Sequence, residues 1–263
     1  MQTQTEMQRE VDEAVRTMRA GGIILYPTDT VWGLGCDATS SAAVERIYRL
    51  KRSGNKKSML VLCASADMIV RYVNKAPGIA FEVMELATSP LTAILPGAAG
   101  LAENLIPDEG TLGVRIPDHE FCRRMLRALG RPIVSTSANI SGEATPVGLQ
   151  DVAREIIDGV DFVVNPRFEG KPTRKASSII AFGEGGEVKI IRTLETPIQK
   201  RFSDVDPFQH VNNVSQQMYF DVGKMEFYEK VLGAEVLLAD LRILTVSTST
   251  SYLGQVRMHD PVR

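Results

Sequence analysis

The chain has 263 residues and a formal net charge of −2, and 44% of its residues are hydrophobic and 24% charged. This composition is that of an ordinary globular protein, and the length suits one large domain or two modest ones. Three cysteines without a CxxC pair and three histidines argue against a disulfide framework and against a zinc or His-rich metal site. The polar start and the absence of a long apolar stretch predict neither a signal peptide nor a membrane span, so we expect a cytoplasmic protein.

The first third of the chain alternates between helical and strand patterns. Apolar residues at helical spacing end at Gly21 and Gly22, and Ser40 or Ser41 can cap a second helix. Pro77 suits the first turn of a third helix. The patterns predict helices over residues 11–18, 41–50 and 77–86 and strands over residues 23–26, 58–63 and 91–95.

The alternation continues beyond residue 100. Asp118 is expected to cap a helix that Gly130 ends, and Val152 and Ile156 mark a further helix. Further strands are predicted over residues 111–116, 132–139 and 160–165 and in a hairpin formed by 177–182 and 187–192. This order indicates an α/β domain with a mixed twisted sheet, complete near residue 195. After the linker-like stretch TLETPIQK a new motif starts at Arg201, which predicts two domains, residues 1–197 and 198–263.

The stretch YPTDTVWGLGCDA, residues 26–38, follows the first predicted strand. The hydroxyls of Thr28 and Thr30 offer neutral hydrogen bonds, and Gly33 and Gly35 allow another backbone to approach closely. The spacing is neither that of a Walker loop nor that of the dinucleotide motif GxGxxG. A turn with a structural glycine and a ligand-binding loop explain this stretch equally well.

The stretch LKRSGNKKS, residues 50–58, places four cations between a predicted helix and a predicted strand. Lys51 can be explained as a residue that satisfies the last carbonyls of the helix. That explanation does not extend to Lys56 and Lys57. A cationic loop that faces a polyphosphate is therefore the favoured interpretation.

Two more strand ends carry polar groups. Arg115 lies in the apolar stretch TLGVRIPDH, where a guanidinium needs either a buried ion pair or a carboxylate or phosphate to bind. The stretch STSANISG, residues 135–142, can hold an anion or a nucleotide through hydroxyls and the amide of Asn139. No Ser/His/Asp set or pair of carboxylates stands out. The pattern therefore favours phosphoryl or nucleotidyl transfer, which depends on positioning and charge stabilisation.

Taken in order, PTDTVWGLGCDA, the lysine-rich loop, GVRIPDH and STSANISG resemble the YrdC-type threonylcarbamoyl-AMP synthase family over residues 8–195. The resemblance implies an α/β fold whose sheet curves around a deep cationic cavity. It also implies an enzyme, a nucleotidyltransferase that condenses L-threonine, bicarbonate and ATP into threonylcarbamoyl-AMP and releases pyrophosphate. The product would serve the threonylcarbamoyladenosine modification of tRNA.

The family motifs also imply roles for individual residues. Thr30, Arg115 and Ser135 would bind threonine, and the catalytic residues would be Lys51, Arg52 and Arg115. The implied nucleotide-binding residues are Lys51, Arg52, Lys57, Thr111, Ser137, Asn139, Thr145 and Arg192. The resemblance implies no protein metal ligand; Mg²⁺ is expected with ATP, and tRNA and downstream threonylcarbamoyl transferase proteins are the expected partners, without a membrane.

The sequence departs from the family pattern at two positions. The family usually has lysine, any residue and arginine in the cationic loop, whereas here Lys51 is followed by Arg52 and Ser53. Trp32 stands where tyrosine is commoner. The first departure leaves open a YciO-like relative, a non-catalytic module that binds RNA or a nucleotide.

The tail carries a second resemblance. Residues 201–214, RFSDVDPFQHVNNV, resemble the entry motif of hotdog-fold acyl-CoA thioesterases, with Asp206 at the position of their catalytic carboxylate and Gln209 in place of the usual glycine. Residues 214–232 would be the central helix of that fold. The tail is shorter than a hotdog domain, which implies an incomplete hotdog-like α+β segment that is truncated, decayed or completed by dimerisation. We expect no thioesterase activity; a bifunctional protein with thioester chemistry is the remaining alternative.

Overall fold

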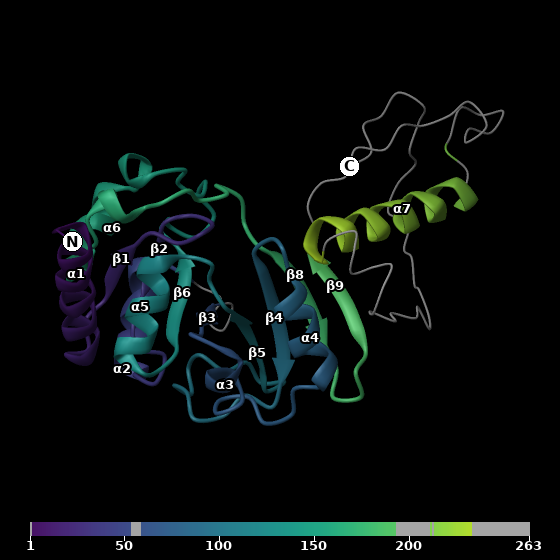
Figure 1. Ribbon diagram of the computed structural model, residues 1–263, viewed down its shortest axis with the longest axis horizontal. Helices are drawn as coiled ribbons and strands as arrows, with labels where there is room; N and C mark the ends of the chain where they lie inside the picture. The colour runs from purple at the N-terminus through teal and green to yellow at the C-terminus, as the bar shows by residue number, and fades with distance from the viewer. Residues whose placement is uncertain (1, 54–58, 193–210, 212, 233–263) are drawn as a thin grey trace. The chain divides into compact units, whose positions relative to one another are not determined.

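The computed structural model describes residues 2–53, 59–192, 211 and 213–232 (Figure 1). The chain divides into two compact units, one made of Met1–Glu85 and Pro90–Ile191 and the other of Leu86–Ser89 and Arg192–Arg263. All the predicted site residues except Arg192 belong to the first unit. The predicted boundary at residue 197 lies outside the described residues.

The elements follow the predicted alternation of helices and strands. The strands are β1 Ile24–Tyr26, β2 Gly33–Gly35, β3 Leu60–Leu62, β4 Leu91–Pro96, β5 Thr111–Arg115, β6 Ile133–Ser137, β7 Phe162–Val163, β8 Ser178–Phe182 and β9 Val188–Arg192. The α-helices are α1 Gln2–Arg19, α2 Ser41–Leu50, α3 Ala66–Ile69, α4 Gly78–Leu86, α5 Glu120–Leu129, α6 Arg154–Gly159 and α7 Asn213–Leu232, and two short 3-10 helices are η1 Leu149–Asp151 and η2 Pro166–Phe168.

The strands form one nine-stranded sheet in the order β7-β1-β2-β6-β3-β5-β4-β8-β9. The pairs β1/β7, β3/β5 and β4/β8 are parallel, whereas β1/β2, β2/β6, β3/β6 and β4/β5 are antiparallel. This confirms the predicted mixed α/β sheet. Because β6 lies between β2 and β3, Gly33 pairs with Ser137, and the loops that precede β2 and follow β6 become neighbours.

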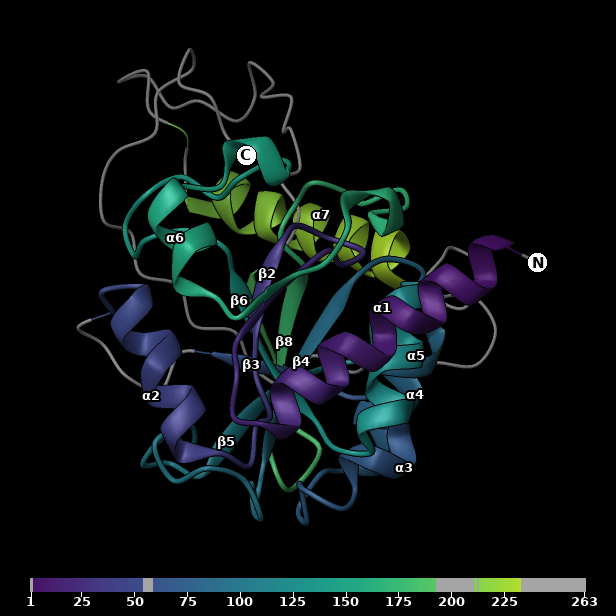
Figure 2. The ribbon, with the colours of Figure 1, turned by 90° about the vertical axis from the view of Figure 1, so that its left-hand side faces the viewer.

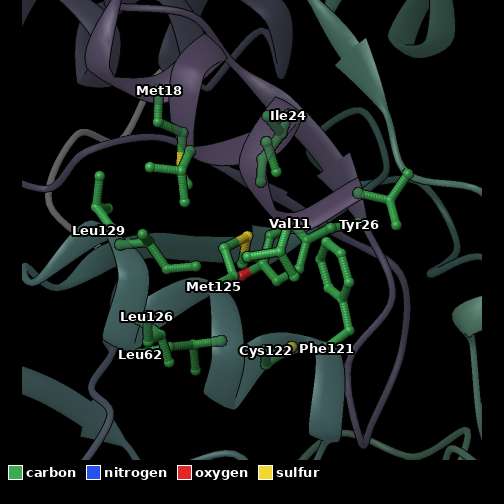
Figure 3. Packing of buried hydrophobic residues seen from close by; sticks show 14 of the residues in the cluster. Val11, Met18, Ile24, Tyr26, Leu62, Phe121, Cys122, Met125, Leu126 and Leu129 are labelled. Carbon is green, nitrogen blue, oxygen red and sulfur yellow. The ribbon is translucent and has the colours of Figure 1, made fainter. Parts of the chain in front are cut away.

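A hydrophobic core cluster lies where α1 and α5 pack together against β1 (Figures 1 and 2). Figure 3 shows its side chains in contact; they come from α1 (Val11 and Met18), β1 (Ile24 and Tyr26), β3 (Leu62) and α5 (Phe121, Cys122, Met125, Leu126 and Leu129). Burying a large apolar side chain stabilises the fold by about 1.5–3 kcal/mol. The cluster thereby fixes the end of β1 and the start of α5, beside which the predicted site residues lie.

The N-cap of α5 corrects one prediction. His119, and not Asp118, is the N-cap, because its Nδ1 accepts a hydrogen bond from the backbone N–H of Cys122 at 3.4 Å. The backbone N–H of Asp118 instead donates to Asp29 Oδ2 at 3.1 Å, a long-range contact that local sequence does not reveal. Gly130 ends α5 as predicted, with a φ of 74°.

Four elements were not predicted, namely β2, α3 and the short 3-10 helices η1 and η2, and one prediction extends too far. β2 escaped notice because two of its three residues are glycine, and α3 because it is a single short turn. Val152 lies at the end of η1, before α6 begins at Arg154. Gly35 is required by packing, since a Cβ there would lie 2.7 Å from Tyr26 Cε1 and 3.0 Å from the Val134 carbonyl oxygen.

The second unit contains α7, which agrees with the helix predicted over residues 214–232. Four of its large apolar side chains are exposed: Met218, Phe220, Val222 and Met225. Asp206 and Gln209, and with them the thioesterase-like motif, lie outside the described residues. Within the described ranges, no helix combines the length and the apolar character needed to cross a membrane.

We expect Gly35→Ala to lower the free energy of unfolding by about 1–3 kcal/mol, because the added methyl group overpacks the contact with Tyr26. Gly78→Ala is the matched control, since no atom lies within 4 Å of a Cβ there. Urea denaturation of both variants measures the difference. An unchanged midpoint for Gly35→Ala would contradict the packing described for β2.

Candidate active site

The loop between β1 and β2 is a buried polar turn. Thr28, Asp29 and Thr30 are 2%, 7% and 4% exposed. Thr28 Oγ1 accepts hydrogen bonds from the backbone N–H groups of Thr30 at 3.1 Å and Val31 at 3.3 Å, and it lies 2.9 Å from Thr30 Oγ1. These bonds satisfy backbone groups that have no sheet partner, so the loop has one defined conformation.

Arg115 ends β5 and joins that strand to the loop. Its side chain is 4% exposed, and its Nη1 lies 3.0 Å from Asp29 Oδ1 and donates a hydrogen bond to Thr30 Oγ1 at 3.1 Å. Among the described residues Asp29 Oδ1 has no hydrogen-bond partner, so its contact with Arg115 is an ion pair. The structure therefore contains the buried ion pair that was one of the two alternatives for Arg115.

One donor of the Arg115 guanidinium has no partner among the described residues. This donor is the Nε–H group, which is buried. A buried N–H without an acceptor costs free energy, about 1–3 kcal/mol, and is uncommon in native structures. A ligand carboxylate that accepts from this group would remove the cost, and planar carboxylates suit the guanidinium geometry.

Ser135 lies in β6 and binds the end of β1. Tyr26 donates a hydrogen bond from its hydroxyl to Ser135 Oγ at 2.9 Å, and Ser135 is 6% exposed. Burial, more than the adjacent Cys122 thiol, raises the pKa of the Tyr26 hydroxyl, so the tyrosine stays neutral and a donor. The Ser135 hydroxyl is thereby oriented, with its proton free to point toward a further acceptor.

A pair of buried hydroxyls beside Arg115 was not anticipated from the sequence. Thr92 Oγ1 and Ser177 Oγ lie 2.8 Å apart, and the two residues are 2% and 7% exposed. Continuing the register Ala93–Val114 by one residue places Thr92 opposite Arg115, on the same face of the sheet. From the sequence one could notice only that Thr92 and Arg115 are polar residues in apolar strands and that Ser177 precedes another strand. Their proximity depends on the pairing of β4 with β5 and β8.

Lys51 is a buried cation that holds the loop after β6. Its Nζ donates hydrogen bonds to the carbonyl oxygens of Ser137 at 2.5 Å and Asn139 at 2.7 Å. An ammonium has three N–H donors, and these two bonds to described residues use two of them. Burial lowers the pKa of Lys51 from its ordinary value of 10.5 to about 8. The charge of this residue is therefore expensive in the free protein and would be stabilised by a bound phosphate.

The loop after β6 lies against the loop before β2. The backbone N–H of Ala138 donates to the carbonyl oxygen of Trp32 at 3.0 Å. Ser137 Oγ donates to Asn139 Oδ1 at 2.5 Å, and Asn139 Nδ2 donates to the carbonyl oxygens of Ile140 and Glu143, both at 2.9 Å. Ser137, Asn139 and Lys51 thus form one network that adjoins the loop of Thr28–Thr30.

Arg52 differs from Lys51 in its surroundings. Its Nη2 pairs with Glu155 Oε2 at 2.6 Å, and both side chains are at least half exposed. Arg52 also has a φ of 51°, in the left-handed region that costs a non-glycine residue about 1–3 kcal/mol. The predicted catalytic Arg52 therefore points to a carboxylate of α6, and its reach toward a nucleotide would require this ion pair to open.

Among the described residues, Thr111 and Thr145, which are also predicted to bind the nucleotide, form no hydrogen bond with this network. Thr111 begins β5, at the opposite end of the strand from Arg115 and about 13 Å along it. Thr145 is exposed in a loop. Arg192 ends β9 in the second unit. Lys57 lies outside the described residues.

Comparisons with known proteins agree with the fold and with the motifs. The family model Sua5/YciO/YrdC, described as telomere recombination, matches residues 16–193. A threonylcarbamoyl-AMP synthase of Idiomarina loihiensis is 34% identical over 167 residues, covering 62% of this chain and 90% of the relative. One of Marinobacter nauticus is 33% identical over 178 residues, covering 67% of this chain and 93% of the relative.

Two solved structures share the fold at 26% sequence identity. P. abyssi Sua5 complexed with L-threonine has a TM-score of 0.60 and is matched over 65% of this chain, which spans only 50% of that chain. E. coli YciO has a TM-score of 0.61 and is matched over 70% of this chain and 89% of its own. The family model ends before the tail, so the hotdog resemblance stays a prediction. The match over most of the chain shows that the protein belongs to the Sua5/YciO/YrdC family.

Proposed function

We propose that this chain is a threonylcarbamoyl-AMP synthase, a nucleotidyltransferase that joins L-threonine, bicarbonate and ATP and releases pyrophosphate. The observation that carries the proposal is the Arg115 guanidinium, which is buried, fixed by Asp29 and Thr30, and left with an Nε–H that no described residue accepts. Such a group fits the carboxylate of an amino acid. The names of the relatives support the same activity.

The threonine site would be formed by the groups around Arg115. The substrate carboxylate would accept from Arg115 Nε, and the hydroxyls of Thr30 and Ser135 would be within the same polar surface. Thr92 and Ser177 add a hydroxyl pair on the face of the sheet that Arg115 occupies. All five side chains are buried, so each hydrogen bond to substrate would form away from competing water.

The chemistry needs little from the protein beyond positioning and positive charge. The threonine amine attacks carbon dioxide derived from bicarbonate, loses a proton and becomes a carbamate. A carbamate oxygen then attacks the α-phosphorus of ATP, and the bond to the β-phosphate oxygen breaks as pyrophosphate leaves. Holding the two reactants side by side replaces a bimolecular encounter and is worth up to about 7–11 kcal/mol of the barrier.

Lys51 would stabilise charge on the triphosphate. Two of its N–H groups hold the Ser137–Asn139 loop, which leaves the third for a phosphate oxygen. No group of three or more His, Cys, Asp or Glu side chains that could hold a metal ion occurs in the described part of the chain. A magnesium ion would therefore enter as part of the substrate, coordinated by triphosphate oxygens, and no residue here is assigned to it.

A second candidate function has one observation in its favour. Ser53 stands where the family pattern has arginine, and the neighbouring Arg52 is paired with Glu155. A chain with this loop could bind RNA or a nucleotide without turnover. Release of pyrophosphate that requires both threonine and bicarbonate distinguishes the synthase from such a module.

The product, as a mixed anhydride, would pass to a downstream threonylcarbamoyl transferase that acts on tRNA, and we propose this exchange in the cytoplasm. For the tail we propose no thioesterase activity. Hydrolysis of an acyl-CoA by the full chain, lost on Asp206→Ala, would contradict that expectation.

Arg115→Lys keeps a positive charge beside Asp29 but removes the Nε–H, so we expect the KM for threonine to rise by about tenfold or more, or about 1.4 kcal/mol. The KM for ATP should change by less than about twofold, because Arg115 faces the amino acid. Pyrophosphate release measured against each substrate gives both values. Arg124→Lys, in the exposed ion pair with Glu120, is the matched control. Equal effects on both substrates would overturn the assignment of Arg115.

Lys51 should make ATP binding dependent on pH. Because burial lowers its pKa to about 8, the ammonium is charged below that pH and becomes neutral above it. The KM for ATP is therefore expected to rise as the pH increases from about 7 to about 9, a range in which exposed lysines stay charged.

Lys51→Met removes the titrating group, so its KM for ATP should be higher than that of the wild type at neutral pH and independent of pH across this range. Lys75→Met, in the exposed pair with Glu184, should retain the wild-type profile. A wild-type KM for ATP that stays constant across this range would count against a phosphate contact by Lys51.

A further inference from the structure

A segment that follows β7 lies against the loop of Thr28–Thr30. This covering segment, residues 165–174, donates two consecutive backbone hydrogen bonds to the loop. The N–H of Thr173 bonds the carbonyl oxygen of Asp29, and the N–H of Arg174 bonds that of Thr30, both at 2.9 Å. The covering segment thus holds the backbone of the two residues that fix Arg115.

A side-chain contact joins the same two stretches. The indole Nε1–H of Trp32 donates to Glu169 Oε1 at 3.1 Å. Trp32 is 1% exposed and is the single tryptophan of the chain. An indole N–H can only donate, so a buried tryptophan needs an acceptor. The carboxylate supplies a charge-assisted bond, which is stronger than a bond between neutral groups.

The main chain of Glu169 is fixed from another element. His119 Nδ1 accepts the N–H of Cys122 at the start of α5, which places the ring proton on Nε2. The Nε2–H then donates to the carbonyl oxygen of Glu169 at 3.0 Å. Glu169 is therefore held at its backbone by α5 and uses its side chain to hold Trp32.

Within the described ranges no cation forms an ion pair with Glu169, and the hydrogen bond from the indole of Trp32 is the contact that the structure shows for its carboxylate. A substitution at Glu169 therefore tests this hydrogen bond.

We propose that Glu169 is a positioning residue for threonine binding. Its carboxylate fixes Trp32, whose carbonyl oxygen accepts from Ala138 and whose chain leads directly into Thr30. The hydrogen bond between Glu169 and Trp32 thereby keeps Thr30 Oγ1 in place to accept from Arg115 Nη1. This contact keeps the Nε–H of the guanidinium directed at the substrate.

The proposal rests on the proposed function for its substrate, and two readouts keep them separate. Glu169→Ala removes the acceptor, so the KM for threonine should rise by about fivefold to about tenfold, while the KM for ATP stays within about twofold. Glu169→Gln keeps an amide oxygen as acceptor and should lie near the wild type. Glu184→Ala, in the exposed ion pair with Lys75, is the matched control and should equal the wild type.

Fluorescence of Trp32 gives the second readout without turnover. L-threonine should change the emission of the wild type and of Glu169→Gln at similar concentrations, whereas Glu169→Ala should need about fivefold more threonine or greater. If Glu169→Ala does not fold, Trp32→Phe removes the indole donor of the same hydrogen bond. Kinetics of this variant should again show a higher KM for threonine and a KM for ATP within about twofold of the wild type.

A threonine KM of Glu169→Ala equal to that of the wild type overturns the proposal for Glu169 and leaves the synthase standing. Equal increases in the KM for threonine and for ATP also overturn the proposal for Glu169, because they indicate that the substitution disturbs the whole site and not threonine binding alone. Absence of pyrophosphate release by the wild type overturns the synthase. Threonine titration of the fluorescence then decides the proposal for Glu169, which fails if threonine does not bind or if it binds Glu169→Ala equally well.

Discussion

The buried ion pair between Arg115 and Asp29 is the interaction on which the site depends. Removing two charges from water is costly, and their attraction offsets the cost only when further hydrogen bonds complete the pair. Here Thr30 and the backbone N–H of Asp118 provide them. The pair therefore joins the end of β5, the loop after β1 and the start of α5, and it leaves the buried Nε of Arg115 without a partner among the described residues.

Lys51 repeats this arrangement in the neighbouring loop. Both Lys51 and Arg115 are buried cations, each uses some of its donors to hold a loop, and each keeps at least one donor. Since an unsatisfied charge is expensive inside a protein, the free structure is held in a state that an anion would stabilise. The hydrogen bond between Ala138 and Trp32 places the two loops side by side, which is what the transfer of a nucleotidyl group to an amino acid derivative requires.

Much of the fold could be predicted from local patterns, because apolar periodicity and glycine or proline at element ends depend on nearby residues alone. The helix from Ser41 and the strand that ends at Arg115 are examples. Features that arise from contacts between distant segments could not be predicted: the pairing of the glycine strand β2, the hydrogen bond of the Asp118 backbone to Asp29, and the hydroxyl pair of Thr92 and Ser177. For Arg115 the sequence left two alternatives, a buried ion pair and a group that binds a ligand carboxylate or phosphate. The structure contains the ion pair with Asp29. We propose that this ion pair holds the guanidinium in position to bind a ligand.

The central claim is that Arg115 reserves a hydrogen bond for the carboxylate of an amino acid. Calorimetric titration of the full chain with L-threonine and with L-threoninol, which has a hydroxymethyl group in place of the carboxylate, tests this most directly. We expect threonine to bind and threoninol to bind at least about tenfold more weakly, since the charge-assisted bond is missing. Equal affinity for the two compounds would contradict the account.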